Sequence, residues 1–159
     1  MISDSPCLAD SPPVALDVAR GVTRLMARSD TFLMCEVPLP NHRRADLMGL
    51  AKKGGIVIVE IKVAKADLTS DAKWRDYLDY CDRFYWAVPP ELAAICEGAD
   101  YLPDRAGLIV ADRYDAAIVR EAAEVKLAAA RRKAETLRLA RRGALRLASQ
   151  LDPALGEGH

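Results

Sequence analysis

The sequence predicts a mixed α/β domain, with a helix, three strands, a second helix and a fourth strand around a mixed central sheet. Two observations carry this prediction. The run at 56–59 is β-branched and apolar on both alternating faces, which is typical of a central, buried strand. A helix-length segment separates this run from the apolar segment Phe84–Val88, so the two strands can run parallel through a crossover.

The first elements follow from apolar spacing. Residues 1–13, rich in Ser, Asp and Pro, predict a flexible tail. Apolar residues recur at helical spacing over Val14–Ala27, which predicts the first helix. Three strands are then expected over Thr31–Val37, Arg44–Leu50 and Gly55–Val63, with the glycines of 51–55 forming the second turn.

The remaining elements complete the domain. A helix is expected over Asp71–Cys81, a strand over Phe84–Val88, a short helix over Glu91–Gly98 and an added strand pair over Gly107–Ala111 and Ala116–Arg120. The resulting division is a tail at 1–13, a domain at 14–120, a basic C-terminal helix at 121–151 and a flexible tail at 152–159.

Two charged side chains at the end of the buried strand are the most informative feature of the chain. Glu60 and Lys62 are two residues apart, so they project from the same face of a strand, while Ile61 points the other way. Burying a carboxylate and an ammonium is costly unless they are paired or bind something. A structural ion pair is one explanation, and a functional site is the other.

The expected hairpins bring two more acids to this place. A turn centred on Lys53 places Asp46 opposite Glu60, and a turn centred on Asn41 places Glu36 opposite Asp46. A slip of one residue would move these side chains to the other face. With these registers, three acids and a lysine line up across three neighbouring strands. Carboxylates that close repel each other unless a cation lies between them.

This set of residues suits metal-dependent hydrolysis. Hard oxygen ligands with water completing the shell suit Mg²⁺ or Mn²⁺, and such a metal activates water and neutralises charge on a phosphate. Asp46 and Glu60 are the expected metal ligands, Glu36 is an auxiliary one, and the backbone carbonyl of Ile61 could add another. The ammonium of Lys62 could orient the attacking water or stabilise the transition state.

The spacing of these residues resembles the PD-(D/E)xK, or restriction-endonuclease-like, nucleases. Asp46 matches the aspartate of that motif, and Glu60 and Lys62 match its ExK pair, although Ala45 stands where the motif has proline. The resemblance implies a restriction-endonuclease-like core of order α-β-β-β-α-β, here with an added strand pair and a basic C-terminal helix.

Longer segments resemble the MmcB-like family within the same superfamily. They are the runs at 43–49, 58–63, 71–74 and 77–89, and the similarity covers 14 to about 142. The aromatic run at 77–89 is more specific than the ExK pair alone. The resemblance implies a bacterial DNA repair protein whose partner is DNA, with other repair proteins as further possible partners.

Other charged residues near the motif are candidate DNA contacts. Arg43 and Arg44 flank Asp46 and could bind a phosphate, although exposed loop arginines are common. Lys65 follows the third strand, and Lys73 lies one helical turn from Tyr77. Tyr77 could face the site or belong to the core.

The C-terminal helix is unusually basic. Residues 126–146 contain eight basic side chains and one acid, Glu135. Its Ala and Leu residues follow helical spacing, and Arg131, Arg138 and Arg142 fall on another face. One interpretation is a helix that contacts DNA phosphates without sequence preference. The alternative is a helix packed on the core by its Ala and Leu side, with the arginines in solvent.

Composition sets the remaining expectations. The 159 residues suit one domain with a sizeable core, and the formal net charge of zero does not by itself indicate nucleic-acid binding. The four cysteines lack metal-type spacing, and no apolar run is long enough to span a bilayer. We expect a cytoplasmic, nucleoid-associated protein, with a homodimer possible.

Two functions therefore compete. The first is a Mg²⁺- or Mn²⁺-dependent DNA endonuclease with Asp46, Glu60 and Lys62 as catalytic residues. The second is a DNA-binding adaptor subunit with weak or no catalysis, whose affinity depends on the basic C-terminal helix. The intact set of acids and lysine favours the enzyme, because an inactive site has no reason to keep buried charges.

Overall fold

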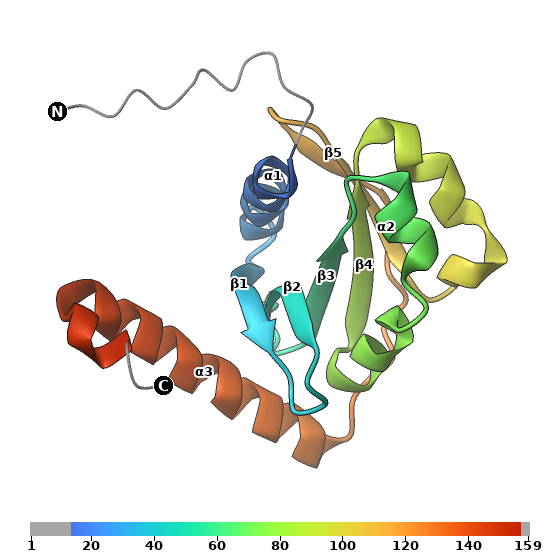
Figure 1. The fold of residues 1–159 in the computed structure, drawn as a ribbon. Coiled ribbons are helices and arrows are strands. Elements are labelled where there is room, and N and C mark those ends of the chain that lie inside the picture. Colours follow the sequence, from blue (N-terminus) through green and yellow to red (C-terminus); the bar gives the residue numbers. More distant parts are fainter. Residues whose placement is uncertain (1–13, 157–159) are drawn as a thin grey trace, which may run out of the picture.

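The computed structural model describes residues 14–156, and the expected tail at 1–13 lies outside them. A single six-stranded mixed sheet with strand order β1-β2-β3-β4-β5-β6 forms the centre of the molecule (Figure 1). The elements are α1 (Ala15–Ala27), β1 (Phe32–Pro38), β2 (Arg44–Leu50), β3 (Ile56–Ile61), α2 (Lys65–Ser70), η2 (Trp74–Tyr80), β4 (Arg83–Val88), η3 (Pro90–Glu97), η4 (Ala99–Tyr101), β5 (Gly107–Ala111), β6 (Ala116–Arg120), α3 (Ala129–Leu151) and η5 (Pro153–Gly156), where η marks a 3-10 helix.

The sheet agrees with the predicted α/β class. Strands β1 to β3 pair antiparallel, β3 to β5 pair parallel, and β6 returns antiparallel. Both predicted hairpin registers are confirmed: Leu47 lies opposite Val59, and Cys35 and Val37 lie opposite Leu47 and Ala45. The ends of β2 and β3 that carry Asp46 and Glu60 are therefore adjacent, as expected.

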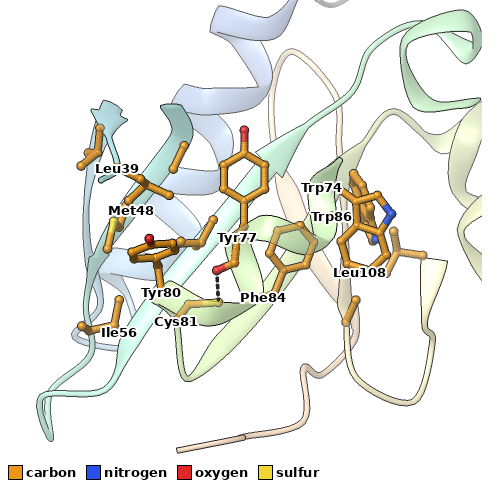
Figure 2. Packing of buried hydrophobic residues seen from close by; sticks show 14 of the residues in the cluster. Leu39, Met48, Ile56, Trp74, Tyr77, Tyr80, Cys81, Phe84, Trp86 and Leu108 are labelled. Carbon is orange, nitrogen blue, oxygen red and sulfur yellow. Dashed lines mark hydrogen bonds between the residues drawn. The ribbon is translucent and has the colours of Figure 1, made fainter. Parts of the chain in front are cut away.

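Each face of the sheet has its own hydrophobic core. Helix α1 covers one face, while α2 and the 3-10 helices η2, η3 and η4 cover the other (Figure 1). On the second face an aromatic group formed by Trp74, Phe84 and Trp86 has ring centroids about 5 Å apart (Figure 2). The aromatic side chains of this part of the chain are core residues: Trp74, Tyr80, Phe84, Tyr85 and Trp86 are all buried.

The expected helix over Asp71–Cys81 is confirmed only in part, because 74–80 form a 3-10 helix and 71–73 are not helical. The chain forms the short α2 instead, breaks at 71–73, and continues as the 3-10 helix η2. The break follows from Asp71, whose carboxylate accepts a hydrogen bond from the backbone N–H of Lys73 at 3.1 Å. Such a local side-chain bond competes with helical hydrogen bonding.

The C-terminal helix also begins later than expected, at Ala129 rather than at 121. Residues 121–128 are extended because their backbone bonds to Asp82 instead of to itself. The N–H of Val125 donates to the Asp82 carbonyl at 2.9 Å, and the N–H of Leu127 donates to the Asp82 carboxylate at 2.8 Å. At the other end, η5 forms where a flexible tail was predicted, and residues 157–159 lie outside the described part.

The packing of α3 differs from one of the two interpretations that the sequence left open. Leu139 and Glu135 are its buried residues, whereas Leu137 is 59% exposed and Ala130, Ala134 and Ala144 are exposed. Apart from Leu139, the Ala and Leu side therefore does not pack on the core as that interpretation had it. The arginines that face the domain instead find partners there, among them Asp82, which forms an ion pair with Arg132.

Candidate functional site

The candidate site lies where β2 begins and β3 ends, on the sheet face that carries the aromatic core. Met48 and Ile58 of this face belong to that core, and Asp46 and Glu60, two residues away along each strand, project to the same side. Asp46 is half-buried, and its carboxylate accepts a hydrogen bond from the backbone N–H of Ile61 at 2.8 Å. The loop after β3 is thereby tied to β2.

Glu60 is a buried acid with incomplete hydrogen bonding. Its side chain lies 3.6 Å from the Lys62 ammonium through Oε1, and its Oε2 is buried with no hydrogen-bond partner. Burial and the neighbouring charge of Asp46 raise the pKa of Glu60 to about 8. Burial also raises the pKa of Asp46, against the lowering effects of the Ile61 N–H and Lys62. Two acids held together in this way favour a bound cation.

Lys62 is held between two carboxylates. Its Nζ lies 2.9 Å from Asp71 Oδ2 and 3.6 Å from Glu60 Oε1, and its backbone N–H donates to the Ala87 carbonyl at 3.0 Å. Burial alone would lower the pKa of Lys62, but the hydrogen bond to Asp71 and the nearby acids outweigh it, so the net pKa is raised. Lys62 is therefore a fixed cation rather than a free base.

Asp71 is the site residue that the sequence analysis missed. It belongs to one of the family-like runs, at 71–74, but the predicted helix placed it in the first turn, where an acid needs no further explanation. In the structure it lies in the break between α2 and η2 and points at Lys62.

Tyr77 borders both the core and the site. Its ring lies among the core aromatics and its hydroxyl points out of the cluster (Figure 2), donating a hydrogen bond to the Arg44 carbonyl at 3.0 Å. Burial, followed by the charges of Glu60 and Asp46, raises the pKa of Tyr77. The hydroxyl thus stays protonated and fixes the start of β2.

Glu36 reaches the site from the edge strand by an unusual backbone conformation. Its φ of 50° is left-handed, within β1, and its side chain is exposed and lies 3.5 Å from Arg44. The charge of Glu36 raises the pKa of Asp46, which places it within electrostatic reach of that acid. Arg146 of α3 holds this bend, because its guanidinium donates to the carbonyls of Cys35 and Glu36.

The predicted DNA contacts fall into two groups. Several are already engaged within the chain: Arg43 with Asp76 at 3.2 Å, Arg138 with Glu135 at 2.8 Å, and Arg131 over the Tyr80 ring at 4.8 Å. Lys65 and Lys73 are exposed. Arg138 and Arg142, with Arg141, also line a groove of about 480 Å³ against Val37 and Pro38, directly after Glu36 in the chain.

Comparison with known proteins identifies the family. The model of the family described as "DNA repair protein MmcB-like" matches residues 6–154. The chain belongs to the MmcB-like family of DNA repair proteins. This membership gives it a role in DNA repair and suggests interaction with DNA.

The chain is also similar to a solved structure. The structure of a protein of unknown function from Silicibacter pomeroyi has 44% sequence identity with the chain and a TM-score of 0.76, and the match covers 94% of this chain and 97% of that one. Comparison with curated proteins finds no match.

Two further findings concern the described residues, 14–156. Within them, His, Cys, Asp and Glu side chains do not form a group of three or more in metal-binding geometry. No helix in this part of the MmcB-like chain is both long and apolar enough to cross a membrane.

Proposed function

We propose that this MmcB-like protein is a divalent-metal-dependent nuclease of the PD-(D/E)xK superfamily that hydrolyses phosphodiester bonds in DNA. The observation that carries the proposal is the pair Asp46 and Glu60, adjacent on β2 and β3, with an unpartnered buried oxygen on Glu60. Most buried side-chain oxygens in proteins are hydrogen-bonded, so an unsatisfied one calls for an explanation, and a bound cation supplies it. The order α1-β1-β2-β3-α2-β4 supports the restriction-endonuclease-like core.

The residues present fit Mg²⁺ or Mn²⁺. Mg²⁺ is commonly held by one or two carboxylates, with water and substrate phosphates as its other ligands, so the pair Asp46 and Glu60 is compatible with it. Asp46 and Glu60 would hold the ion, with Glu36 and the Ile61 carbonyl as auxiliary ligands. When bound, the ion would lower the pKa of a water molecule and neutralise charge on the scissile phosphate.

The side chains of the site have complementary tasks. Glu60, whose pKa is about 8, must release its proton before both of its oxygens can act as ligands, so cation binding rises with pH. Lys62 keeps its proton and can donate to the attacking water or to a phosphate oxygen. Asp71 positions Lys62, and the Tyr77 hydroxyl positions the backbone at the start of β2.

The arginine groove beside Pro38 gives the site a means of holding DNA. Arg138, Arg141 and Arg142 line it, and it begins one residue after Glu36. Phosphate contacts of this kind position a duplex without reading its sequence. A nucleic-acid backbone in this groove would pass close to the candidate metal ligands.

A second candidate function is a DNA-binding adaptor with weak or no catalysis. It is favoured by the contacts of Lys62, which is held by both Asp71 and Glu60 in this structure. An adaptor would need the arginine groove but not the acids.

A cleavage assay separates the two functions. The purified protein is incubated with labelled single-stranded, duplex, flap and four-way DNA in Mg²⁺, Mn²⁺ or EDTA. We expect metal-dependent cutting that Lys62→Ala lowers by about 10²- to 10³-fold, because a fixed charge at the reacting phosphate is lost, with DNA affinity unchanged. Lys53→Ala, at an exposed lysine of the β2–β3 turn, is the matched control. Cutting that persists in Lys62→Ala would refute the assignment.

Binding is tested separately with a charge reversal in the groove. We expect the double variant Arg141→Glu/Arg142→Glu to weaken DNA binding and to flatten its salt dependence by roughly one unit of slope per lost phosphate contact. Arg20→Glu, on the exposed side of α1, is the control. Salt-sensitive binding that needs the groove, without cutting of any substrate, would select the adaptor.

A further inference from the structure

Helix α3 is docked by its polar side. Arg132 forms an ion pair with the buried Asp82, and Arg146 donates to carbonyls of β1. Arg131 stacks over the ring of Tyr80, at the end of η2. Leu139 is the one large apolar side chain of α3 that is buried. The arginines of this amphipathic helix therefore point toward the domain.

Another side of α3 is mostly apolar and exposed, and part of it borders the domain, where Leu137 and Ala140 line a hollow with Gly54. We call this side the outer stripe, and it consists of Ala130, Lys133, Leu137, Ala140, Ala144, Leu147 and Leu151. Leu137, Leu147 and Leu151 are 59%, 65% and 89% exposed. These positions alternate by three and four residues, which is the heptad spacing of a coiled-coil seam. In Figure 1 the helix runs along one side of the domain and extends past β1.

The chemistry of the outer stripe selects its partner. DNA offers phosphates, which do not match Leu and Ala side chains. A helix lying on a membrane surface needs cations flanking its apolar side, but here Arg131, Arg132 and Arg146 are turned away, toward the domain. A heptad seam fits another helix with the same seam, and the same stripe on a second copy supplies one.

We propose that the outer stripe of α3 pairs antiparallel with the outer stripe of a second copy, across a two-fold axis near residue 142. In this register Ala140 faces Ala144 and Leu137 faces Leu147, so small residues meet at the axis and leucines meet on either side. Lys133 then faces Leu151 and lies beside Asp152, an exposed acid at the end of the helix. The two helix dipoles oppose each other, which is favourable.

Lys133 also accounts for the choice of register. It is the one charged residue of the outer stripe, and a single polar residue in a seam fixes the alignment of the two helices. A parallel pairing would place the two copies of Lys133 against each other, whereas the antiparallel one gives each copy an acid. The complementarity of Lys133 and Asp152 thus favours the antiparallel dimer.

Sedimentation equilibrium of the full chain, without DNA or metal, tests the proposal. We expect a mass twice the 17.4 kDa of the chain, and a shift to the monomer mass in the double variant Leu137→Lys/Leu147→Lys. Leu16→Lys is the matched control, because Leu16 is an exposed leucine (55%) on α1. Circular dichroism checks that each variant is folded. A monomeric unmodified chain, or a dimer that both variants leave intact, would overturn the proposal.

Cross-linking tests the orientation. In a background in which Cys7 and Cys35 are replaced by serine, chains carrying Ala140→Cys are mixed with chains carrying Ala144→Cys and oxidised. We expect a disulfide-linked heterodimer, whereas Ala130→Cys mixed with Ala144→Cys stays unlinked because these positions lie far apart in the antiparallel pair. The reverse pattern would overturn the register. Neither experiment depends on nuclease activity, so this inference and the proposed function can fail separately.

Discussion

A buried acid lies at each end of β3, and the two differ in hydrogen bonding: Asp82, beside the start of the strand, has a full set of partners, and Glu60, near its end, does not. At the start of the strand, the backbone N–H of Ile56 donates to Asp82 at 2.7 Å, and Leu127 and Arg132 complete the hydrogen bonding of that carboxylate. At the end of the strand, Glu60 has a weak contact with Lys62 and one oxygen without a partner. Both side chains are almost fully buried, at 1% and 5% exposure.

The difference in pKa follows from the partners. Burial alone would raise the pKa of Asp82, but the hydrogen bonds from Arg132 and from the backbone outweigh it, and the net pKa is lowered. For Glu60, burial and the charge of Asp46 outweigh the lowering effects of Lys62 and of a backbone hydrogen bond with Asp46, and the pKa rises to about 8. A buried acid with all its partners stabilises the fold, whereas one without them lowers stability and is retained for what it binds.

The largest expected effect on stability comes from removing the satisfied acid. Asp82→Ala leaves the N–H groups of Ile56 and Leu127 and the charge of Arg132 without their acceptor. We expect the free energy of unfolding to fall by about 3–5 kcal/mol. Urea denaturation measures it, with Asp79→Ala, at an exposed aspartate, as the control. A change no larger than that of the control would show that Asp82 is not an anchor.

The second expected effect is the stabilisation of the fold by Mg²⁺ bound at Glu60. At pH above 8, Mg²⁺ should raise the free energy of unfolding by about 2.7 kcal/mol when it is present at a hundredfold excess over its Kd. Glu60→Gln should abolish this gain because the anionic ligand is lost. Thermal denaturation with and without EDTA measures it, and equal stabilisation of both proteins would contradict a metal site at Glu60.

The pH dependence of stability should have opposite signs at the two ends of β3. Because the folded pKa of Glu60 is about 8 and its ordinary value is 4.5, the folded state holds the extra proton between these pH values. Stability from this group is therefore complete below pH 4.5 and is lost toward pH 8, by up to about 1.4 kcal/mol per pH unit. Asp82, with a lowered pKa, stabilises the fold above its ordinary value of 3.8 and loses that contribution in acid.

Urea unfolding at a series of pH values measures this dependence in the absence of divalent metal. Glu60→Gln should remove the loss between pH 4.5 and 8 while leaving the loss in acid unchanged. An unchanged slope in Glu60→Gln would show that the proton is held elsewhere.

The smallest expected effect comes from Asp71→Asn. The ion pair with Lys62 is partly buried, so its loss should change stability by about 1 kcal/mol or less. Its effect on cutting should be larger than its effect on folding, because Lys62 loses its fixed position. If Asp71 positions Lys62, Asp71→Glu should restore the rate of cutting, and DNA affinity should stay the same in both variants. A purely structural role would not give this rescue.

Much of the sheet could be predicted from the sequence. The apolar run of β3 and the glycines of the β2–β3 turn determine the strand pairing, and this pairing places Asp46 beside Glu60. Local patterns did not reveal Asp71, because its contact with Lys62 depends on a break that its own side chain creates. The left-handed backbone of Glu36 has no signal in the sequence, since a non-glycine residue rarely adopts it.

The orientation of α3 could not be predicted from the sequence, for a related reason. Helical spacing shows that a helix has an apolar side but not which way that side faces. The usual assumption is that it packs inward. Here Asp82 and the carbonyls of β1 attract the arginines of α3, and these partners come from elements that are distant in the sequence.

The bend at Glu36 has a consequence for solubility during folding and storage. Strand β1 is an edge of the sheet, and the unpaired backbone groups of a flat edge can recruit strands of other molecules and start aggregation. The left-handed residue interrupts the flat edge, and Arg146 occupies two of its carbonyls. The same contact that shapes the candidate site therefore protects the edge of the sheet, so replacing Arg146 should promote fibrous or amorphous aggregates.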